Sequence, residues 1–246
     1  MVLFVFILGL FIGSFLNVCI YRIPVGKSVV FPPSSCGSCG HQLNFIDMIP
    51  FVGYFIFGGK CRYCKASYSI QYPMIELLNG IVYALLFYRY GLTLYTLLYG
   101  IISSLLIVIS IIDLKTQTIP DGLNLFGVIV VVFLGIYMFR GNYSTHFFGF
   151  LFGFGLFLVI AMITNAMGGG DIKLMGVLGL LFGLTGIIFV TVISFIYGAI
   201  ISIMLIATKK ATRKDYIPFG PFIALAALTY ILYGNELLSI YFDTLI

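Results

Sequence analysis

Residues 93–112, TLYTLLYGIISSLLIVISII, contain no charged side chain and end directly before Asp113. A run of this length suffices for an α-helix to cross the hydrocarbon core of a bilayer. The chain is 61% hydrophobic and 9% charged, with a mean hydropathy of +1.16, which excludes a soluble core. Comparable stretches lie at 2–20, 74–90, 123–139, 146–165, 172–185, 187–207 and 219–241. The stretch at 172–185 is the shortest. We therefore expect an all-α bundle of about eight transmembrane helices.

The basic residues predict how these spans are oriented. Lys and Arg gather in short loops on the cytoplasmic side. With both termini outside, all 13 basic residues except Arg89 and Arg140 fall in cytosolic loops. The net charge of +5 then reflects topology, so we expect membrane lipid and no nucleic acid as a partner. No basic residue precedes the first span and no small-residue cleavage site follows it, so we expect a retained anchor.

Residues 21–73 form the one sizeable polar segment and carry two C-x-x-C pairs, Cys36 with Cys39 and Cys61 with Cys64. Their separation slightly exceeds the usual spacing of about 15–20 residues in a four-thiolate zinc site. Disulfides persist mainly in oxidising compartments, so a cytosolic loop favours a structural zinc. Free thiols in a linker are the alternative. We expect Cys19 to be a packing residue inside the first span, and we assign no ligand role to His41.

Two aspartates stand at the ends of apolar stretches on the same predicted side of the membrane. Asp113 closes the third span and Asp171 opens the sixth, so they can meet in space. Two carboxyl groups in a partly desolvated site cannot both ionise easily, so one holds a proton and the other can act as a base toward water. Such a pair can hydrolyse a peptide bond. As alternatives, Asp171 would be a helix N-cap and Asp113 would mark the end of a span. Asp121 follows Pro120 and is predicted to begin a helix, so it ranks below the pair.

The glycines before Asp171 allow close backbone approach and unusual dihedral angles, which leaves room for an extended substrate. The motif that ends in Asp171 is one of a series along the chain. Its motifs, in chain order, are Gly13-Ser14-Phe15-Leu16-Asn17-Val18, Tyr21-Arg22-Ile23-Pro24, the paired knuckles with Gly59-Lys60-Cys61-Arg62-Tyr63-Cys64, Tyr72-Pro73-Met74-Ile75-Glu76-Leu77-Leu78, Ile112-Asp113, Ile119-Pro120-Asp121, Gly168-Gly169-Gly170-Asp171-Ile172-Lys173-Leu174 and Ile217-Pro218-Phe219-Gly220-Pro221. This series resembles the bacterial type IV prepilin leader peptidases over nearly the whole chain.

The resemblance implies an inner-membrane aspartic protease that removes the short basic leader of type IV pilin-like precursors at the cytosolic membrane face. The positions matching the family's catalytic pair are Asp113 and Asp171. The resemblance implies substrate contacts at Gly168, Gly169, Gly170 and Lys173. Many members also methylate the new N-terminal residue with S-adenosylmethionine, and for this donor we nominate Gly59, Lys60 and Glu76.

The expected domains are a first transmembrane helix at 1–20, a cytosolic zinc-binding loop domain at 21–73, and a seven-helix membrane domain at 74–246 that carries the protease site. Two other hypotheses remain at this point. A cation- or proton-coupled transporter also uses intramembrane acids, but places them near the bilayer midplane. A non-enzymatic scaffold would recruit pilus machinery through its zinc loop.

Overall fold

The structure, a computed structural model, describes residues 1–246 except 140, 165, 166, 210, 211, 213, 214, 216 and 246. Four residues used above for the orientation lie outside this described part: Arg140, Lys210, Arg213 and Lys214. The described residues contain helices and two isolated β-bridges but no β-strand. The all-α prediction is therefore confirmed.

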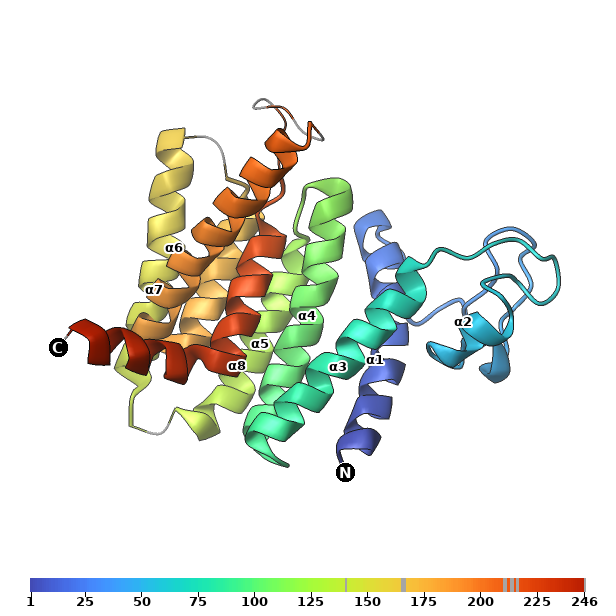
Figure 1. The fold of residues 1–246 in the computed structure, drawn as a ribbon, viewed down its shortest axis with the longest axis horizontal. Helices are drawn as coiled ribbons and strands as arrows, with labels where there is room; N and C mark the ends of the chain where they lie inside the picture. Colours follow the sequence, from blue (N-terminus) through green and yellow to red (C-terminus); the bar gives the residue numbers. More distant parts are fainter. Residues whose placement is uncertain (140, 165–166, 210–211, 213–214, 216, 246) are drawn as a thin grey trace. The chain divides into compact units, whose positions relative to one another are not determined.

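Connections of a few residues join α3 to α4, α4 to α5, α5 to α6 and α6 to α7, whereas a long irregular segment separates α1 from α3 (Figure 1). Their bounds are α1 Val2–Arg22, η1 Ile23–Val25, η2 Phe45–Met48, α2 Val52–Ile56, α3 Gln71–Tyr90, α4 Leu94–Thr116, α5 Asp121–Met138, α6 Tyr143–Thr164, α7 Gly169–Ala207 and α8 Gly220–Leu245. The chain forms two compact units, Met1–Val108 and Ile109–Ile246, so that α4 begins in one and ends in the other.

In the N-terminal unit, α1 packs directly on α3 because glycines let the two backbones approach. A Cβ at Gly9 would lie 2.8 Å from Cα of Gly80, and one at Gly13 would lie 2.7 Å from Cα of Glu76. The buried amide of Asn79 strengthens this packing by donating to the Gly9 carbonyl at 2.7 Å. Small residues four apart on α1 thus serve helix packing.

In the C-terminal unit, α7 packs on α6 and α8 and reverses direction at Gly183 (Figure 1). Gly183 has φ 70° and ψ −176°, which is not helical. Gly153 of α6 would touch both the Met175 carbonyl and the Ile187 side chain if it carried a Cβ. In a straight helix these two residues would lie about 18 Å apart. The helix is therefore a hairpin of two antiparallel segments.

Five described stretches are long and apolar enough to cross a membrane: Val2–Val25, Leu94–Thr116, Tyr143–Thr164, Gly169–Ala207 and Gly220–Tyr241. The apolar part of α5, Asp121–Gly135, is shorter, and α3 carries Glu76 and Arg89. The two segments of the hairpin correspond to the predicted sixth and seventh spans, 172–185 and 187–207. The break lies at Gly183 and not at residue 186. The polytopic membrane architecture is thus confirmed, while the number of eight crossings stays a prediction.

Candidate active site and candidate metal centre

Asp113 lies in the last turn of α4 and is only 3% exposed. Its Oδ2 accepts a hydrogen bond of 2.9 Å from the backbone N–H of Gly220, the first residue of α8. A Cβ at Gly220 would lie 2.7 Å from this oxygen, so the glycine permits the contact. The carboxyl group of Asp113 is therefore buried at the end of its span and held by a neighbouring helix.

Asp171 is 4% exposed and lies in the first turn of α7. The N-cap position belongs to Gly168, and no side chain caps this helix, so the N-cap interpretation of Asp171 is wrong. Its carboxyl group lies close enough to Asp113 for the two to interact electrostatically. Within the described residues, Oδ1 of Asp171 is buried without a hydrogen-bond partner. The fold therefore brings the two acids together and leaves one carboxyl oxygen available.

The segment before Asp171 is fixed by the start of α5. A Cβ at Gly170 would lie 2.6 Å from Cβ of Ile119, so only glycine fits this contact. The Gly170 carbonyl accepts a hydrogen bond of 3.2 Å from the amide of Asn124, which is buried. Sequence reasoning missed Asn124, because a single amide in an apolar helix gives no signal. By contrast, Gly169 is exposed, and a Cβ there would meet no atom within 4 Å.

Lys173 and Asp121 form an ion pair beside this turn. Lys173 Nζ donates to Asp121 Oδ1 at 2.6 Å, and the two side chains are 48% and 74% exposed. Asp121 also begins α5 directly after Pro120, as predicted. Such an exposed pair contributes little stability. Asp121 is therefore a solvated acid with its own partner, unlike the buried pair.

The four cysteines come together as a cluster in the N-terminal unit. The sulfur atoms of Cys36, Cys39, Cys61 and Cys64 lie within 4.8 Å of one another. The Cys36 and Cys64 sulfurs are 3.7 Å apart, close to the separation of about 3.8 Å that a tetrahedron with Zn–S bonds of about 2.3 Å gives. His41 stacks on Tyr63, with ring centroids 3.6 Å apart, and does not belong to the cluster.

The two C-x-x-C knuckles have the same local structure. Each first cysteine accepts a hydrogen bond from the residue four positions on, Gly40 or Lys65, at 2.9 and 3.0 Å. Both of these residues have positive φ, 71° and 62°. An antiparallel bridge closes each turn, Ser35 with Gln42 and Lys60 with Ser67. Two equivalent turns therefore present two sulfurs each to a common point.

Electrostatics favour the thiolate form of the first cysteine in each knuckle. The backbone N–H groups of Cys39 and Ser38 lower the pKa of Cys36 to about 6. The N–H groups of Cys64 and Tyr63 lower the pKa of Cys61 in the same way. For Cys64, an N–H from Ala66 acts in the opposite direction to burial and the neighbouring sulfurs, which raise its pKa to about 11. Metal ions bind thiolates, so this cluster can hold one.

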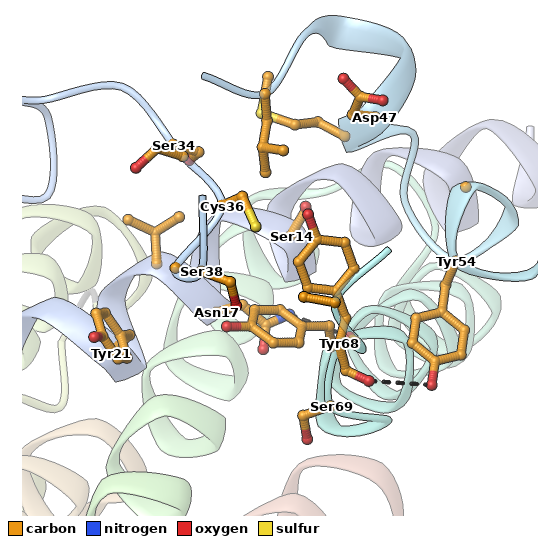
Figure 2. A pocket seen from close by; sticks show the side chains of 18 of the residues that line it. Ser14, Asn17, Tyr21, Ser34, Cys36, Ser38, Asp47, Tyr54, Tyr68 and Ser69 are labelled. Atoms are coloured by element: carbon orange, nitrogen blue, oxygen red, sulfur yellow. Dashed lines mark hydrogen bonds between the residues drawn. The ribbon is translucent and has the colours of Figure 1, made fainter. Parts of the chain in front are cut away.

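A cavity of about 870 Å³ lies beside the cluster in the same unit (Figure 2). Its wall includes α1, the irregular segment with Cys36, and the start of α3. Figure 2 shows Tyr54 joined to the backbone of Tyr68 by a hydrogen bond of 3.4 Å. Burial and the sulfurs of Cys61 and Cys36 raise the pKa of the Tyr68 hydroxyl. Sequence reasoning predicted neither the cavity nor the place of Tyr68.

The residues nominated for a methyl donor have different positions around this cavity. Lys60 and Glu76 line it, whereas Gly59 does not. Gly59 has φ 66°, and a Cβ there would lie 2.7 Å from the ring of Tyr54, so it shapes the turn that holds Tyr54. Glu76 is 7% exposed, and its Oε2 accepts a hydrogen bond of 2.7 Å from the N–H of Phe51.

Fold and site together define a helical membrane protein with paired buried aspartates and a four-cysteine cluster. Residues 7–90 match the model of the bacterial peptidase A24 N-terminal domain, and residues 100–203 match the model of the type IV leader peptidase family. The chain belongs to the type IV leader peptidase family.

Its relatives share most of its length. A Bacillus subtilis protein named prepilin leader peptidase/N-methyltransferase is 30% identical over 237 residues, covering 96% of each chain. A Pseudomonas aeruginosa protein of the same name is 29% identical over 273 residues, covering 98% of this chain and 93% of the relative. A protein of the same name from Myxococcus xanthus is 31% identical over 215 residues, covering 85% of this chain and 64% of the relative. No solved structure gives a significant match.

Proposed function

We propose that this chain is a membrane aspartic endopeptidase that removes the leader of type IV prepilin-like precursors, and that it then methylates the new N-terminal amine. The names of the full-length relatives support both activities. The observation that carries the protease assignment is the buried, interacting pair of Asp113 and Asp171. Family membership disfavours the transporter and scaffold hypotheses.

The surroundings of the two acids suggest different roles for them. The Gly220 N–H at the start of α8 stabilises a negative charge on Asp113. Asp171 has a buried oxygen without a donor, so the proton that the pair shares rests on this carboxyl group. In this mechanism Asp113 takes a proton from the attacking water, while Asp171 donates its proton to the oxygen of the scissile carbonyl. The amide then breaks: the leaving amine receives the proton held by Asp113, and a hydroxyl group of the tetrahedral intermediate returns a proton to Asp171 as the new carboxyl group forms.

Cleavage of a purified pilin-like precursor by the protein in lipid tests this mechanism. We expect Asp113→Asn and Asp171→Asn each to reduce the cleavage rate by at least about 10³-fold, because an amide cannot transfer the proton. Asp121→Asn is the matched control, since this acid is exposed and paired with Lys173. Retention of rapid cleavage by either variant of the buried pair would rule out the dyad.

We further propose that the substrate chain runs along Gly168 and Gly169, which are exposed beside the buried acids. The proposed roles differ along this motif. Gly170 positions the turn through its contacts with Ile119 and Asn124. Lys173 extends from the same turn into solvent, where it pairs with Asp121 and offers a charged contact to the substrate.

The methyl donor and the metal belong to the N-terminal unit in this proposal. The thiol cluster has the separation and the hydrogen-bonded sulfurs that suit zinc, which would stabilise the irregular segment between α1 and α3. S-adenosylmethionine supplies the methyl group. Lys60 and Glu76 would contact it, while Gly59 would act through Tyr54.

For location, we propose the bacterial inner membrane with both termini outside and the four-cysteine segment in the cytosol. The apolar helices support the membrane assignment. Cys39 and Cys64 are exposed, so they report orientation. A membrane-impermeant thiol reagent added outside intact spheroplasts of metal-depleted cells should leave both unlabelled, and permeabilisation should label them. Labelling without permeabilisation would reverse the topology.

A further inference from the structure

The cavity of the N-terminal unit has the size and polarity of a small-molecule site. Its volume of about 870 Å³ falls within the range of about 300–1,000 Å³ that such sites have. Two of its lining residues keep buried oxygens without partners in the described part of the chain: Oδ1 of Asn17 and Oδ1 of Asp47. The remaining polar atoms of both side chains are occupied, since Asn17 donates to the Tyr72 carbonyl and Asp47 caps η2. These free acceptors suit a ligand that donates hydrogen bonds.

The charges around the cavity are of both signs. Glu76 and Asp47 are its acids. Glu76 is buried, and Asp47 is intermediate in exposure. Its cations are Arg22, Lys27, Lys60 and Arg62. Its tyrosines are Tyr21, Tyr54, Tyr68 and Tyr72. A zwitterion suits such a lining, because carboxylates and aromatic faces attract a cationic group while the cations attract a carboxylate.

We propose that this cavity binds the methyl-sulfonium donor, and that the carboxylate of Glu76 accepts the proton of the N-terminal amine that becomes methylated. This rests on the methyl transfer proposed above. S-adenosylmethionine offers each matching group: a sulfonium and an amine for the acids, a carboxylate for the cations, and an aromatic base for the tyrosines. Glu76 is aimed at the cavity from the first turns of α3, with one oxygen held by Phe51.

The reaction balances with one proton acceptor. A protonated amine has no lone pair for attack, so Glu76 first removes one proton from the ammonium group. The nitrogen lone pair then forms a bond to the methyl carbon. The carbon–sulfur bond breaks, and its electron pair stays on sulfur as a neutral thioether. The neutral amine gains a positive charge as its lone pair bonds to the methyl carbon and it retains its two remaining protons, and Glu76 passes its proton to solvent.

Binding of S-adenosylhomocysteine, measured by titration calorimetry, tests the cavity. Lys60→Met removes a cation that lines it, and we expect at least about tenfold weaker binding. Lys115→Met is the control, because this exposed lysine belongs to the C-terminal unit, and its binding should equal that of wild type. Equal affinities for wild type and Lys60→Met would overturn the cavity assignment.

A pH profile of single-turnover methylation of a cleaved precursor tests Glu76. An α-amino group has a pKa near about 8, so Glu76→Gln should lose about 100-fold at pH 6 and about tenfold at pH 7, and match wild type at pH 9. Glutamine still accepts the Phe51 hydrogen bond, and the assay is run at saturating donor, so weaker donor binding does not contribute to the deficit. Asp243→Asn is the carboxylate-to-amide control, since Asp243 is exposed in α8.

The outcomes separate this inference from the function on which it rests. A deficit of Glu76→Gln that is equal at every pH, or the absence of a deficit, would overturn the proton-acceptor role while methyl transfer stands. A deficit that a higher donor concentration removes at every pH would assign Glu76 to donor binding alone and would also overturn the proton-acceptor role. Absence of methylation in wild type, with precursor cleavage intact, would remove the methyltransferase function itself.

Discussion

At the scale of single residues, neighbouring glycines before Asp171 differ in what surrounds them. Gly170→Ala would place a methyl group against the β-branched Ile119, whereas Gly169→Ala would meet open space. We expect Gly170→Ala to displace Asp171 and reduce precursor cleavage by about 10–100-fold, because small displacements of reacting groups are costly. Gly169→Ala leaves Asp171 in place and adds a methyl group beside the proposed substrate path, so we expect a smaller loss than for Gly170→Ala.

Steady-state cleavage assays on the two alanine variants, at equal amounts of membrane-inserted protein, measure this difference. If both variants cleaved at the wild-type rate, the close contact between Gly170 and Ile119 would have no part in placing the acid. The comparison also separates positioning of the carboxyl group from room for the substrate, since Gly169 is the exposed glycine of the two.

The sequence predicted the residues with distinctive chemistry but not the contacts that orient them. Two acids in apolar surroundings stand out, because isolated carboxyl groups are costly in a membrane. The donor to Asp113 is a backbone N–H of Gly220, and the holder of Gly170 is a side-chain amide on another helix. Such contacts depend on which helix ends meet in space, and no local pattern records that.

At the scale of elements, the reversal inside α7 depends on Gly183. Its φ of 70° with ψ near −176° is reached readily only by glycine. We expect Gly183→Ala to lower the free energy of unfolding by about 1–3 kcal/mol, the cost of forcing a side chain into that conformation. Gly155→Ala in α6 is the control, because a Cβ there meets nothing within 4 Å.

Thermal unfolding in detergent, followed by the loss of far-ultraviolet circular dichroism, measures both variants. The expected result is a lower midpoint for Gly183→Ala and an unchanged or slightly higher midpoint for Gly155→Ala. Equal midpoints for Gly183→Ala and wild type would mean that this turn tolerates a side chain.

Helices were predictable because apolar stretches without charges indicate spans, and their ends lie within a few residues of the predicted ones. Two features of the helices could not be predicted from apolar stretches. The polar start of α3 at Gln71 is helical although the predicted span begins at residue 74. The break in α7 occurs at Gly183, although Gly176 and Gly179 of the same segment also contact α6, so no local pattern singles it out.

At the scale of the whole molecule, the irregular segment between α1 and α3 contains few buried apolar side chains among its described residues, so we propose that a bound metal stabilises its fold. We expect about one zinc per chain in wild type and none in Cys36→Ser, because three thiolates bind the ion far more weakly than four. Cys19→Ala should keep the metal, since Cys19 is buried within α1 and outside the cluster.

Elemental analysis of the purified variants gives the stoichiometry, and limited proteolysis between residues 26 and 70 reports whether the segment is folded. Metal-free Cys36→Ser should be cleaved there faster than wild type. Metal retained at wild-type levels by Cys36→Ser would exclude this cysteine as a ligand. The cluster itself was predictable because each knuckle places two sulfurs on one turn, whereas the adjacent cavity arises from tertiary packing.

The division of the chain inside α4 has an implication for ancestry. The two family matches, 7–90 and 100–203, fall on either side of a joint close to that helix, and each half holds its own set of reactive groups. Gene fusion or loss at such a joint would transfer one chemistry without dismantling the other. A chain that kept the second half alone would retain the paired aspartates and lose the four-cysteine cluster with its cavity.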